Sequence, residues 1–319
     1  MLDIIPNVKV IPPSDQLRAQ AKYHGASLML VNIPDGLIFQ IDLQQYSLSY
    51  SEVQFIHIPP SLHCFKYSLP NQATSVFFFH VFIPNEVLIL QWNTKLNVFE
   101  HCERLSPASS PTCPSIPYNL DYYISWSTFS CHIVSSLVDS LLSDHYNSDQ
   151  LIHFPKLPSL SKMVSKFKGK EKTAKVLDQS WFLEELMEKY SRISLLSYFQ
   201  ISFILLYLCE NYSGLYYYNR FIEIISNSES LFTQKKYEQF IEQFLGVFVH
   251  QLSIFSVDDV ELIFNSITNT LNIGMVLEKI IENSKCNGEL NKFRKQLKSI
   301  SQSISSYCID ELPLVELEK

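Results

Sequence analysis

Histidine, cysteine, serine and aspartate are the residue types in this chain that could bind a metal or form a hydrolytic site. His57 and His63 flank a Pro-Pro turn, and Cys64 follows the second histidine. A metal site needs three or four converging ligands with supporting hydrogen bonds. No spaced carboxylate or cysteine pair completes such a set here, so we expect no metal and interpret both histidines as core or edge residues.

A Ser-His-Asp hydrolytic site is the second kind of chemistry to consider. It would require a pocket in which His63, Asp42 and a serine converge. The sequence has no GxSxG, HExxH, GxxxxGK or GxGxxG motif, and its seven glycines offer little for close approach to a nucleotide. Two Ser-x-x-Lys sequences, at 159–162 and 165–168, have a lactamase spacing without its partners. We therefore predict no enzyme and no cofactor, and keep a hidden hydrolase as a hypothesis for side-chain geometry to test.

The composition favours an aromatic-rich protein with protein partners. Charged residues make up 18% of the 319 residues, and the net charge of −7 argues against a protein that mainly coats phosphate backbones. Seven single cysteines without a CxxC pair, and no secretory signal, predict reduced thiols in an intracellular protein. The uncharged window at residues 193–209 is short for a membrane span and contains three serines, so we expect a buried helix and no membrane.

The elements of the first half are strand-length apolar runs separated by turns rich in Pro, Gly and Asn. The runs are 28–33, 37–43, 53–58, 62–67, 76–83 and 87–92. For residues 25–68 this cadence predicts an antiparallel meander, and the whole set predicts a sandwich or a strongly bent sheet. A Pro-rich connection, 106–117, precedes one helix that ends near Ser143 and has an apolar stripe for docking on the sheet.

The second half is helical by its 3.6-residue period. We predict an α+β fold with four parts: a β-rich domain at 1–143, a Lys/Ser-rich linker at 144–177, an all-α domain at 178–304 and an extended tail at 305–319. Asp178 is the expected cap of the first helix, and residues 237–255 form the clearest one. Pro313 marks the tail.

Two further segments could contact partners. The lysines between Lys162 and Lys175 are consistent with a solvated linker, a nuclear-import signal or RNA contact, and an RNA-binding adaptor acting through them is our alternative function. Tyr216, Tyr217 and Tyr218 are consecutive, so on a helix they cannot all face one core. At least one should be exposed, which predicts a protein interface there.

Several phrases together resemble one family. Residues 25–42 (GASLMLVNIPDGLIFQID), the Ile58-Pro-Pro-x-x-His63 turn and Leu90-Gln-Trp92 followed by Thr94 are similar to the N-terminal domain of the a1-cistron splicing factor family. Segments near 178–183, 199–207 and 237–252 resemble its C-terminal domain, in the right order. Gln40 and Ser61 stand where the family usually has Gly, so the backbone could be arranged differently at those two positions.

The resemblance implies a non-enzymatic assembly chaperone in pre-mRNA splicing. Family members pair a β-rich domain with a helical, VHS-like domain. They bind the RNase H-like and Jab/MPN-like domains of the large U5 small nuclear ribonucleoprotein (snRNP) scaffold protein, and keep the U5 helicase and RNA off until maturation. Their tail bridges the two scaffold domains by strand addition. Here that role would fall to Leu312, Leu314, Val315 and Leu317.

The resemblance also implies shuttling between cytoplasm and nucleus with the U5 precursor, and no direct sequence-specific nucleic-acid binding. We expect release to be regulated by phosphorylation of a serine near the interface, because phosphate adds charge that a desolvated contact does not tolerate. The sequence leaves open which serine acts.

Overall fold

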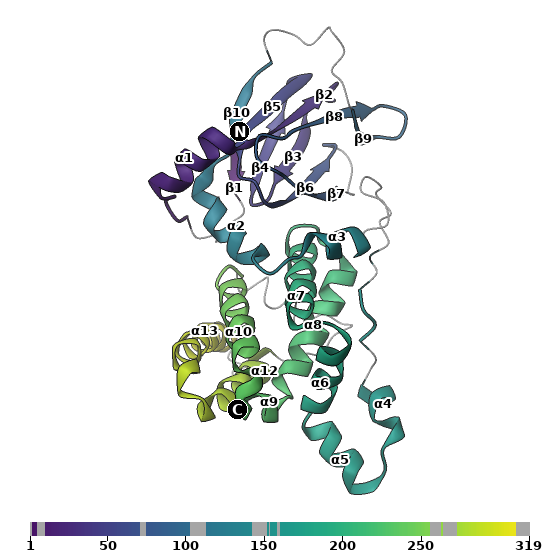
Figure 1. The fold of residues 1–319 in the computed structure, drawn as a ribbon, viewed down its shortest axis with the longest axis vertical. Helices are drawn as coiled ribbons and strands as arrows, with labels where there is room; N and C mark the ends of the chain where they lie inside the picture. Colours follow the sequence, from purple (N-terminus) through teal and green to yellow (C-terminus); the bar gives the residue numbers. More distant parts are fainter. Residues whose placement is uncertain are drawn as a thin grey trace, which may run out of the picture. The chain divides into compact units, whose positions relative to one another are not determined.

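The computed structural model describes residues 2–4, 10–70, 75–102, 113–141, 152, 154–157, 160–255, 263 and 273–310 (Figure 1). Contacts divide the chain into two compact units. The first is Met1–His153 with Tyr207–Glu210, and the second is Phe154–Leu206 with Asn211–Lys319. The first unit is β-rich and the second is helical, so the α+β prediction is confirmed.

The first unit is a sandwich of two five-stranded sheets. One sheet has, in spatial order, β1 (Leu2–Ile4), β4 (Gln44–Leu48), β3 (Leu37–Ile41), β6 (Leu62–Ser68) and β7 (Val76–Val81). The other has β10 (Ser115–Pro117), β5 (Glu52–Ile58), β2 (Ala26–Val31), β8 (Val87–Asn93) and β9 (Val98–His101). Aromatic side chains of both sheets fill one core: the rings of Phe39 and Phe55 stack with centroids 5.6 Å apart. The predicted sandwich is confirmed.

The predicted meander over residues 25–68 is wrong. Consecutive strands of this stretch change sheets: β2 and β5 pair with each other in one sheet, while β3, β4 and β6 pair in the other. Both β2 and β3 are buried at most positions, and each occupies an interior position of its own sheet. Turn residues specify where the chain reverses, not which strand becomes the neighbour, so the spacing of runs and turns does not determine the strand pairing.

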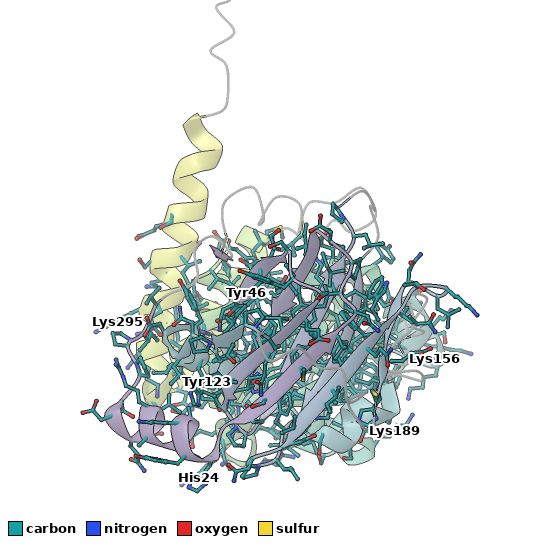
Figure 2. The ribbon with its side chains drawn as sticks, turned by 90° about the horizontal axis from the view of Figure 1, so that it is seen from above. His24, Tyr46, Tyr123, Lys156, Lys189 and Lys295 are labelled. Atoms are coloured by element: carbon teal, nitrogen blue, oxygen red, sulfur yellow. The ribbon has the colours of Figure 1, made fainter. Side chains whose placement is uncertain are left out.

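Sequence periodicity missed several short or exposed elements. Helix α1 (Asp15–His24) buries only Ala21, so no apolar stripe marks it. The Ser14 hydroxyl caps the helix by accepting the Leu17 N–H at 3.2 Å, and His24 lies at its end (Figure 2). Strands β1, β4, β9 and β10 were also missed; β10 lies at the end of the predicted Pro-rich connection and pairs in parallel with β5.

The covering helix is present but broken. A 3₁₀ turn η1 (Leu120–Tyr122) leads into α2 (Tyr123–Ser130), and α3 (Ser135–Leu141) follows after an interruption. The Trp126 indole N–H donates to the Leu62 carbonyl at 2.8 Å and docks α2 on β6, as predicted. Hydroxyls of Thr128 and Ser130 bond back to carbonyls of the same helix, and such back-bonding weakens helices. The single helix predicted to end near Ser143 is therefore corrected to two.

The second unit consists of helices around a central one, α7 (Arg192–Tyr207), which is buried at every position from Leu195 to Leu205. The others are α4 (Leu160–Met163), η2 (Val164–Lys166), α5 (Gly169–Leu177), α6 (Ser180–Lys189), α8 (Tyr212–Ser226), α9 (Glu229–Thr233), η3 (Lys235–Tyr237), α10 (Glu238–Leu252), α12 (Ile273–Asn283), η4 (Ser284–Cys286), η5 (Gly288–Leu290) and α13 (Asn291–Asp310). Phe199 of α7 stacks on Tyr218 of α8 at 5.0 Å. Within the part of the chain that the structure describes, no helix combines the length and hydropathy needed to span a bilayer.

Two predicted boundaries differ from the structure. Residues 154–177, predicted as linker, belong to the second unit and form α4, η2 and α5, because Leu157, Met163 and Val164 are buried among the lysines. The tail was predicted to begin at 305, but α13 continues to Asp310. The first residue in this region that a helix cannot accommodate is Pro313, which also disfavours helix at the residue before it.

Two helical glycines give a matched prediction about packing. A Cβ at Gly214 would lie 2.8 Å from the Ser202 carbonyl oxygen and 2.9 Å from the Leu206 nitrogen, whereas a Cβ at Gly246 would meet nothing nearer than 3.7 Å. We expect Gly214→Ala to lower the free energy of unfolding by about 1–3 kcal/mol through overpacking. Gly246→Ala should raise it by about 0.5–1 kcal/mol, because alanine favours helix. Urea unfolding measures the free energy of unfolding of both variants. The same change in Gly214→Ala and in Gly246→Ala would contradict this packing.

Candidate functional site

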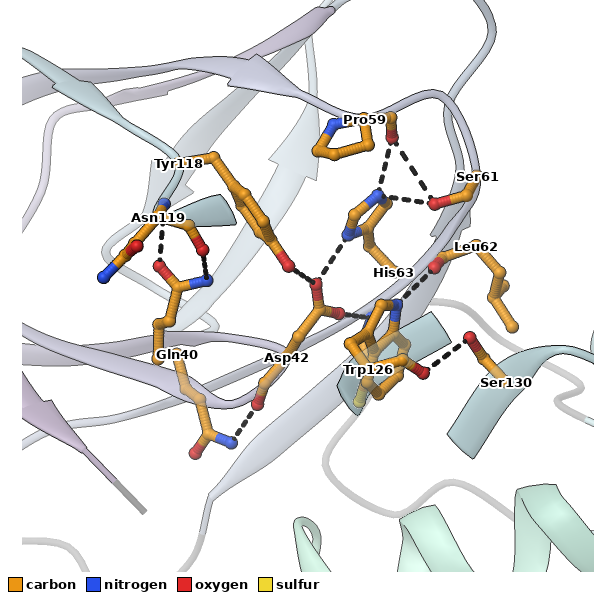
Figure 3. A network of polar contacts seen from close by, with 12 residues as sticks. Gln40, Asp42, Pro59, Ser61, Leu62, His63, Tyr118, Asn119, Trp126 and Ser130 are labelled. Carbon is orange, nitrogen blue, oxygen red and sulfur yellow. Dashed lines mark hydrogen bonds and ion pairs between the residues drawn. The ribbon is translucent and has the colours of Figure 1, made fainter. Parts of the chain in front are cut away.

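A buried polar network centred on Asp42 and His63 resembles a catalytic site (Figure 3). Asp42 occupies the two-residue turn between β3 and β4 with a left-handed φ of 53°, a conformation that Asp tolerates better than most residues. His63 lies on β6, the strand beside β3. Both side chains are fully buried, so the sheet itself brings together two residues that are 21 positions apart.

The network has the connectivity of a hydrolytic triad. The His63 Nδ1 lies 2.6 Å from Asp42 Oδ2, and the His63 Nε2 lies 3.0 Å from the Ser61 hydroxyl oxygen. These are the contacts by which an aspartate orients a histidine and a histidine activates a serine. The hypothesis of a hidden hydrolase therefore has to be judged on protons and access.

The position of one proton excludes this activation in the observed geometry. The Pro59 carbonyl oxygen lies 2.7 Å from His63 Nε2 and can only accept. Nε2 therefore carries a hydrogen and donates it, so it cannot take a proton from Ser61, whichever of Asp42 and His63 holds the proton between them. In addition, the cavity of about 230 Å³ beside β7 is lined by Leu62 and His80, among others, but not by Asp42, Ser61 or His63. A substrate in that cavity would not reach these three side chains. The triad-like residues are structural.

The remaining bonds of the network tie the two sheets together. Asp42 Oδ1 accepts the Cys64 N–H at 2.9 Å, and Oδ2 accepts the Tyr118 hydroxyl at 2.8 Å. Tyr118 directly follows β10 of the other sheet. Burial, and then the nearby Asp42 carboxylate, raise the pKa of Tyr118 well above its usual value, which keeps the phenol a donor. Asp42 thus links β3, β6 and the end of β10.

Gln40 and Ser61, which replace glycines usual in the resembled family, both join this network. The Gln40 amide donates to the Asp42 carbonyl at 2.6 Å, and Ser61 contacts His63. Neither residue has a positive φ. The backbone at both positions is therefore one that any residue can adopt, and the two side chains add polar contacts where glycine would have none.

Comparison with known sequences identifies the family. Residues 24–143 match the AAR2 N-terminal domain, and residues 154–310 match the AAR2 C-terminal repeat region. The chain belongs to the AAR2 family. This confirms the resemblance to the a1-cistron splicing factors, and the gap between the two AAR2 matches contains the boundary between the two compact units, at His153 and Phe154.

One curated relative is the Protein AAR2 homolog of Caenorhabditis elegans. It is 26% identical to this chain over 126 residues, which are 37% of this chain and 35% of that protein. The match thus spans about a third of the length of this AAR2 relative.

The three consecutive tyrosines of the AAR2 C-terminal region lie on α8 and differ in exposure. Tyr216 is 50% exposed, as predicted for at least one of them, whereas Tyr217 and Tyr218 are buried. The Tyr217 ring stacks on Phe154 at 4.5 Å, and the Tyr218 hydroxyl donates to Gln251 at 3.1 Å. Tyr217 and Tyr218 are therefore corrected to core residues, and a partner contact at Tyr216 stays a prediction.

The predicted tail contacts Leu312, Leu314, Val315 and Leu317 lie outside the residues that the structure describes. Their role remains a prediction from the sequence and from AAR2 membership. The described chain ends at Asp310 of α13, two residues before the first of them.

Asp178 links two helices in the AAR2 C-terminal region and confers a pH dependence. Its Oδ1 accepts the N–H of Ser180, the first residue of α6, at 2.9 Å, and its Oδ2 accepts the hydroxyl of Ser230 on α9. The N-cap of α6 is Gln179, so the predicted cap at Asp178 is wrong by one residue. Burial alone raises the pKa of Asp178, but the hydrogen bonds from Ser180 and Ser230 outweigh it and hold the pKa below its usual value. The carboxylate form therefore stabilises the fold.

The predicted consequence is a stability difference that disappears in acid. Asp178→Ala should lower the free energy of unfolding by about 1–3 kcal/mol at pH 7, because the hydrogen bonds that Ser180 and Ser230 donate to a charged group are lost. The charge-dependent part is fully present above the unfolded pKa of about 3.9 and is lost as pH falls through the lowered folded pKa. Urea unfolding at pH 7, 5 and 3 measures this. Glu188→Ala, at an exposed position on the same helix, is the control and should change little. An undiminished difference at pH 3 would contradict the ionic role.

Proposed function

We propose that this AAR2-family protein is a non-enzymatic assembly chaperone of the U5 snRNP in pre-mRNA splicing. It binds the RNase H-like and Jab/MPN-like domains of the large U5 scaffold protein. Bound there, it keeps the U5 helicase and RNA away until the particle matures. The observation that carries this proposal is the ordered match of both AAR2 regions, over residues 24–143 and 154–310.

The geometry at Asp42 supports a non-enzymatic role. A hydrolase would use the Ser61-His63-Asp42 arrangement, but His63 Nε2 donates to Pro59 and the side chains of Asp42 and His63 are fully buried. The same carboxylate accepts hydrogen bonds from Cys64 on one sheet and from Tyr118 next to the other, which is a structural use of the aspartate.

Attachment to the scaffold is proposed to occur through the C-terminal tail. In Leu312–Leu317, alternate side chains would face opposite sides of an added strand, with Leu312 and Leu314 on one side and Val315 and Leu317 on the other. Strand addition supplies main-chain hydrogen bonds for affinity and side-chain pockets for selectivity. Tyr216 is a second proposed contact, since it is the exposed member of its trio.

Shuttling between cytoplasm and nucleus with the U5 precursor, and release by serine phosphorylation, are parts of the same proposal. Phosphate at a desolvated contact would weaken it by charge. Phosphomimetic substitutions of interface serines that never weaken the complex would remove the release mechanism and leave the chaperone role standing.

A titration with purified components tests the binding step. The full chain is titrated by calorimetry into each scaffold domain, and into both together. We expect saturable binding that a purified U5 helicase competes away. Ser61→Ala is a control that should bind like the unaltered chain, because the serine is assigned no reaction. Absence of binding to either domain would contradict the proposal.

A further inference from the structure

Residues 160–177, which we call the lysine arm, carry a charge opposite to that of the rest of the chain. Six lysines and one glutamate lie between Lys162 and Lys175, so this segment has a net charge of +5 in a chain of −7, and the remainder has −12. In Figure 1, α4 and α5 of the arm form a hairpin within the helical unit. A positive element on an acidic protein is a localised site for a polyanion.

Met163 and Val164 anchor the arm in the helical unit, whereas most of its other residues are open to solvent. Helix α5 has no buried residue, and Leu177 at its end is 73% exposed. Packing therefore does not explain its sequence. Lys168, Lys170 and Lys172 are exposed, and none has an ion pair among the described residues, whereas Lys166 pairs with Glu185 at 3.3 Å on the surface. Three unpaired ammonium groups within five residues repel one another, so an anion bound there would relieve the repulsion.

Two other lysines of the arm are held in place by aromatic rings. The Nζ atoms of Lys166 and Lys175 lie 5.3 and 5.2 Å from the Trp181 ring centroid, and 5.2 and 5.7 Å from that of Phe167. The two rings meet edge to face at 5.3 Å, and the Trp181 indole N–H donates to the Lys175 carbonyl at 3.1 Å. Cation–π contacts restrict the two lysines, which lowers the entropy lost when they bind an anion.

The aromatic pair beside the lysines favours a nucleic acid over an acidic peptide. The arm contains no arginine, whose fork binds carboxylate and phosphate alike, so the lysines alone do not distinguish the two anions. Lysine acts as a point charge, which suits the phosphates of a flexible chain. Phe167 and Trp181 are half-buried, so part of each ring is accessible from solvent. In single-stranded nucleic acids, the unpaired bases stack on aromatic side chains of this kind.

We propose that the lysine arm binds the phosphate backbone of single-stranded RNA without sequence preference. Lys168, Lys170 and Lys172 neutralise phosphates, while Lys166 and Lys175 contact the chain beside the Phe167–Trp181 pair. The inference goes beyond the proposed chaperone role and does not depend on it, because scaffold binding requires no RNA contact by this protein.

Fluorescence polarisation with a labelled, unstructured 20-nucleotide RNA tests the inference on the full chain. The variant Lys168→Gln/Lys170→Gln/Lys172→Gln should bind roughly tenfold to a hundredfold more weakly at 50 mM salt. The slope of log affinity against log salt should fall in magnitude by about 2, since each lost phosphate contact on a single strand removes about 0.7. The same three positions changed to Arg should restore binding.

The control variant removes equal charge elsewhere. Lys292→Gln/Lys295→Gln/Lys298→Gln changes three exposed lysines of α13, among them Lys295 (Figure 2), and should leave RNA affinity within about twofold. Circular dichroism should show both variants folded, because all six side chains are exposed. Three results would overturn the inference: no RNA binding by the unaltered chain, an equal loss in both variants, or equally tight binding of polyglutamate or of phosphatidylserine vesicles. The last two partners would indicate a protein or a membrane surface instead.

Discussion

Replacing Asp42 with alanine is expected to lower the free energy of unfolding of the β sandwich by about 3–5 kcal/mol, because three buried groups lose their partner at about 1–3 kcal/mol each. The substitution leaves His63 in a fully buried site without its acidic partner. It also removes the acceptor for the Cys64 N–H and the Tyr118 hydroxyl, two further buried donors. Because these bonds join both sheets, the loss should affect the whole sandwich and not one strand.

The measurement is urea unfolding of the full chain, with hydrogen exchange over residues 26–68 to report the sandwich separately from the helical unit. Ser61→Ala is the matched control and should cost less than about 1 kcal/mol, because Pro59 and His63 keep each other as partners when the hydroxyl is removed. A structural network predicts this asymmetry. Equal and small effects of both substitutions would show that the Asp42 network does not stabilise the fold.

Deleting residues 309–319 is expected to weaken scaffold binding by about a hundredfold or more while leaving stability unchanged. A strand that adds to a partner sheet contributes several hydrogen bonds, each worth about 1 kcal/mol net, and buries apolar side chains worth about 1.5–3 kcal/mol each. Losing even about 3 kcal/mol of this corresponds to roughly a hundredfold in Kd. The deletion starts two residues before the end of α13, so the packed body of the helical unit is untouched.

Calorimetric titration of the deleted chain into the scaffold domains measures this loss, and the urea unfolding midpoint checks the fold. The paired variants Leu312→Ser/Leu314→Ser and Val315→Ser/Leu317→Ser compare the two faces of the added strand. If only main-chain hydrogen bonds hold the strand, both double variants should lower the affinity slightly and equally. If side-chain pockets contribute, one double variant should lower the affinity more than the other. Unchanged affinity after the deletion would contradict attachment by the tail.

The sequence predicted strands where apolar runs met turn residues, and the sandwich followed from their number and spacing. It did not predict which strands pair, because β2 and β5 join across two intervening strands of the other sheet. Helix α1 was invisible to periodicity, since it buries only Ala21. The composition of the lysine arm predicts a linker, because its six lysines outnumber its few apolar anchors, Met163 and Val164 among them.

The site was only partly predictable for a related reason. Asp42 and His63 could be named as a possible pair, but the residues that decide their role come from elsewhere. The Pro59 carbonyl is a backbone group that no sequence motif marks, and Tyr118 lies 76 residues from Asp42. Both groups reach Asp42 and His63 only because the sheets fold as they do. Likewise, three adjacent tyrosines indicate that one is exposed without telling which, and the orientation of α8 selects Tyr216.

Affinity purification of the tagged full chain from cell extract is the most direct test of the chaperone role. The account predicts recovery of the U5 scaffold protein without the U5 helicase, and loss of the scaffold protein when residues 309–319 are deleted. Recovery of the helicase together with the scaffold protein, or of neither, would contradict it.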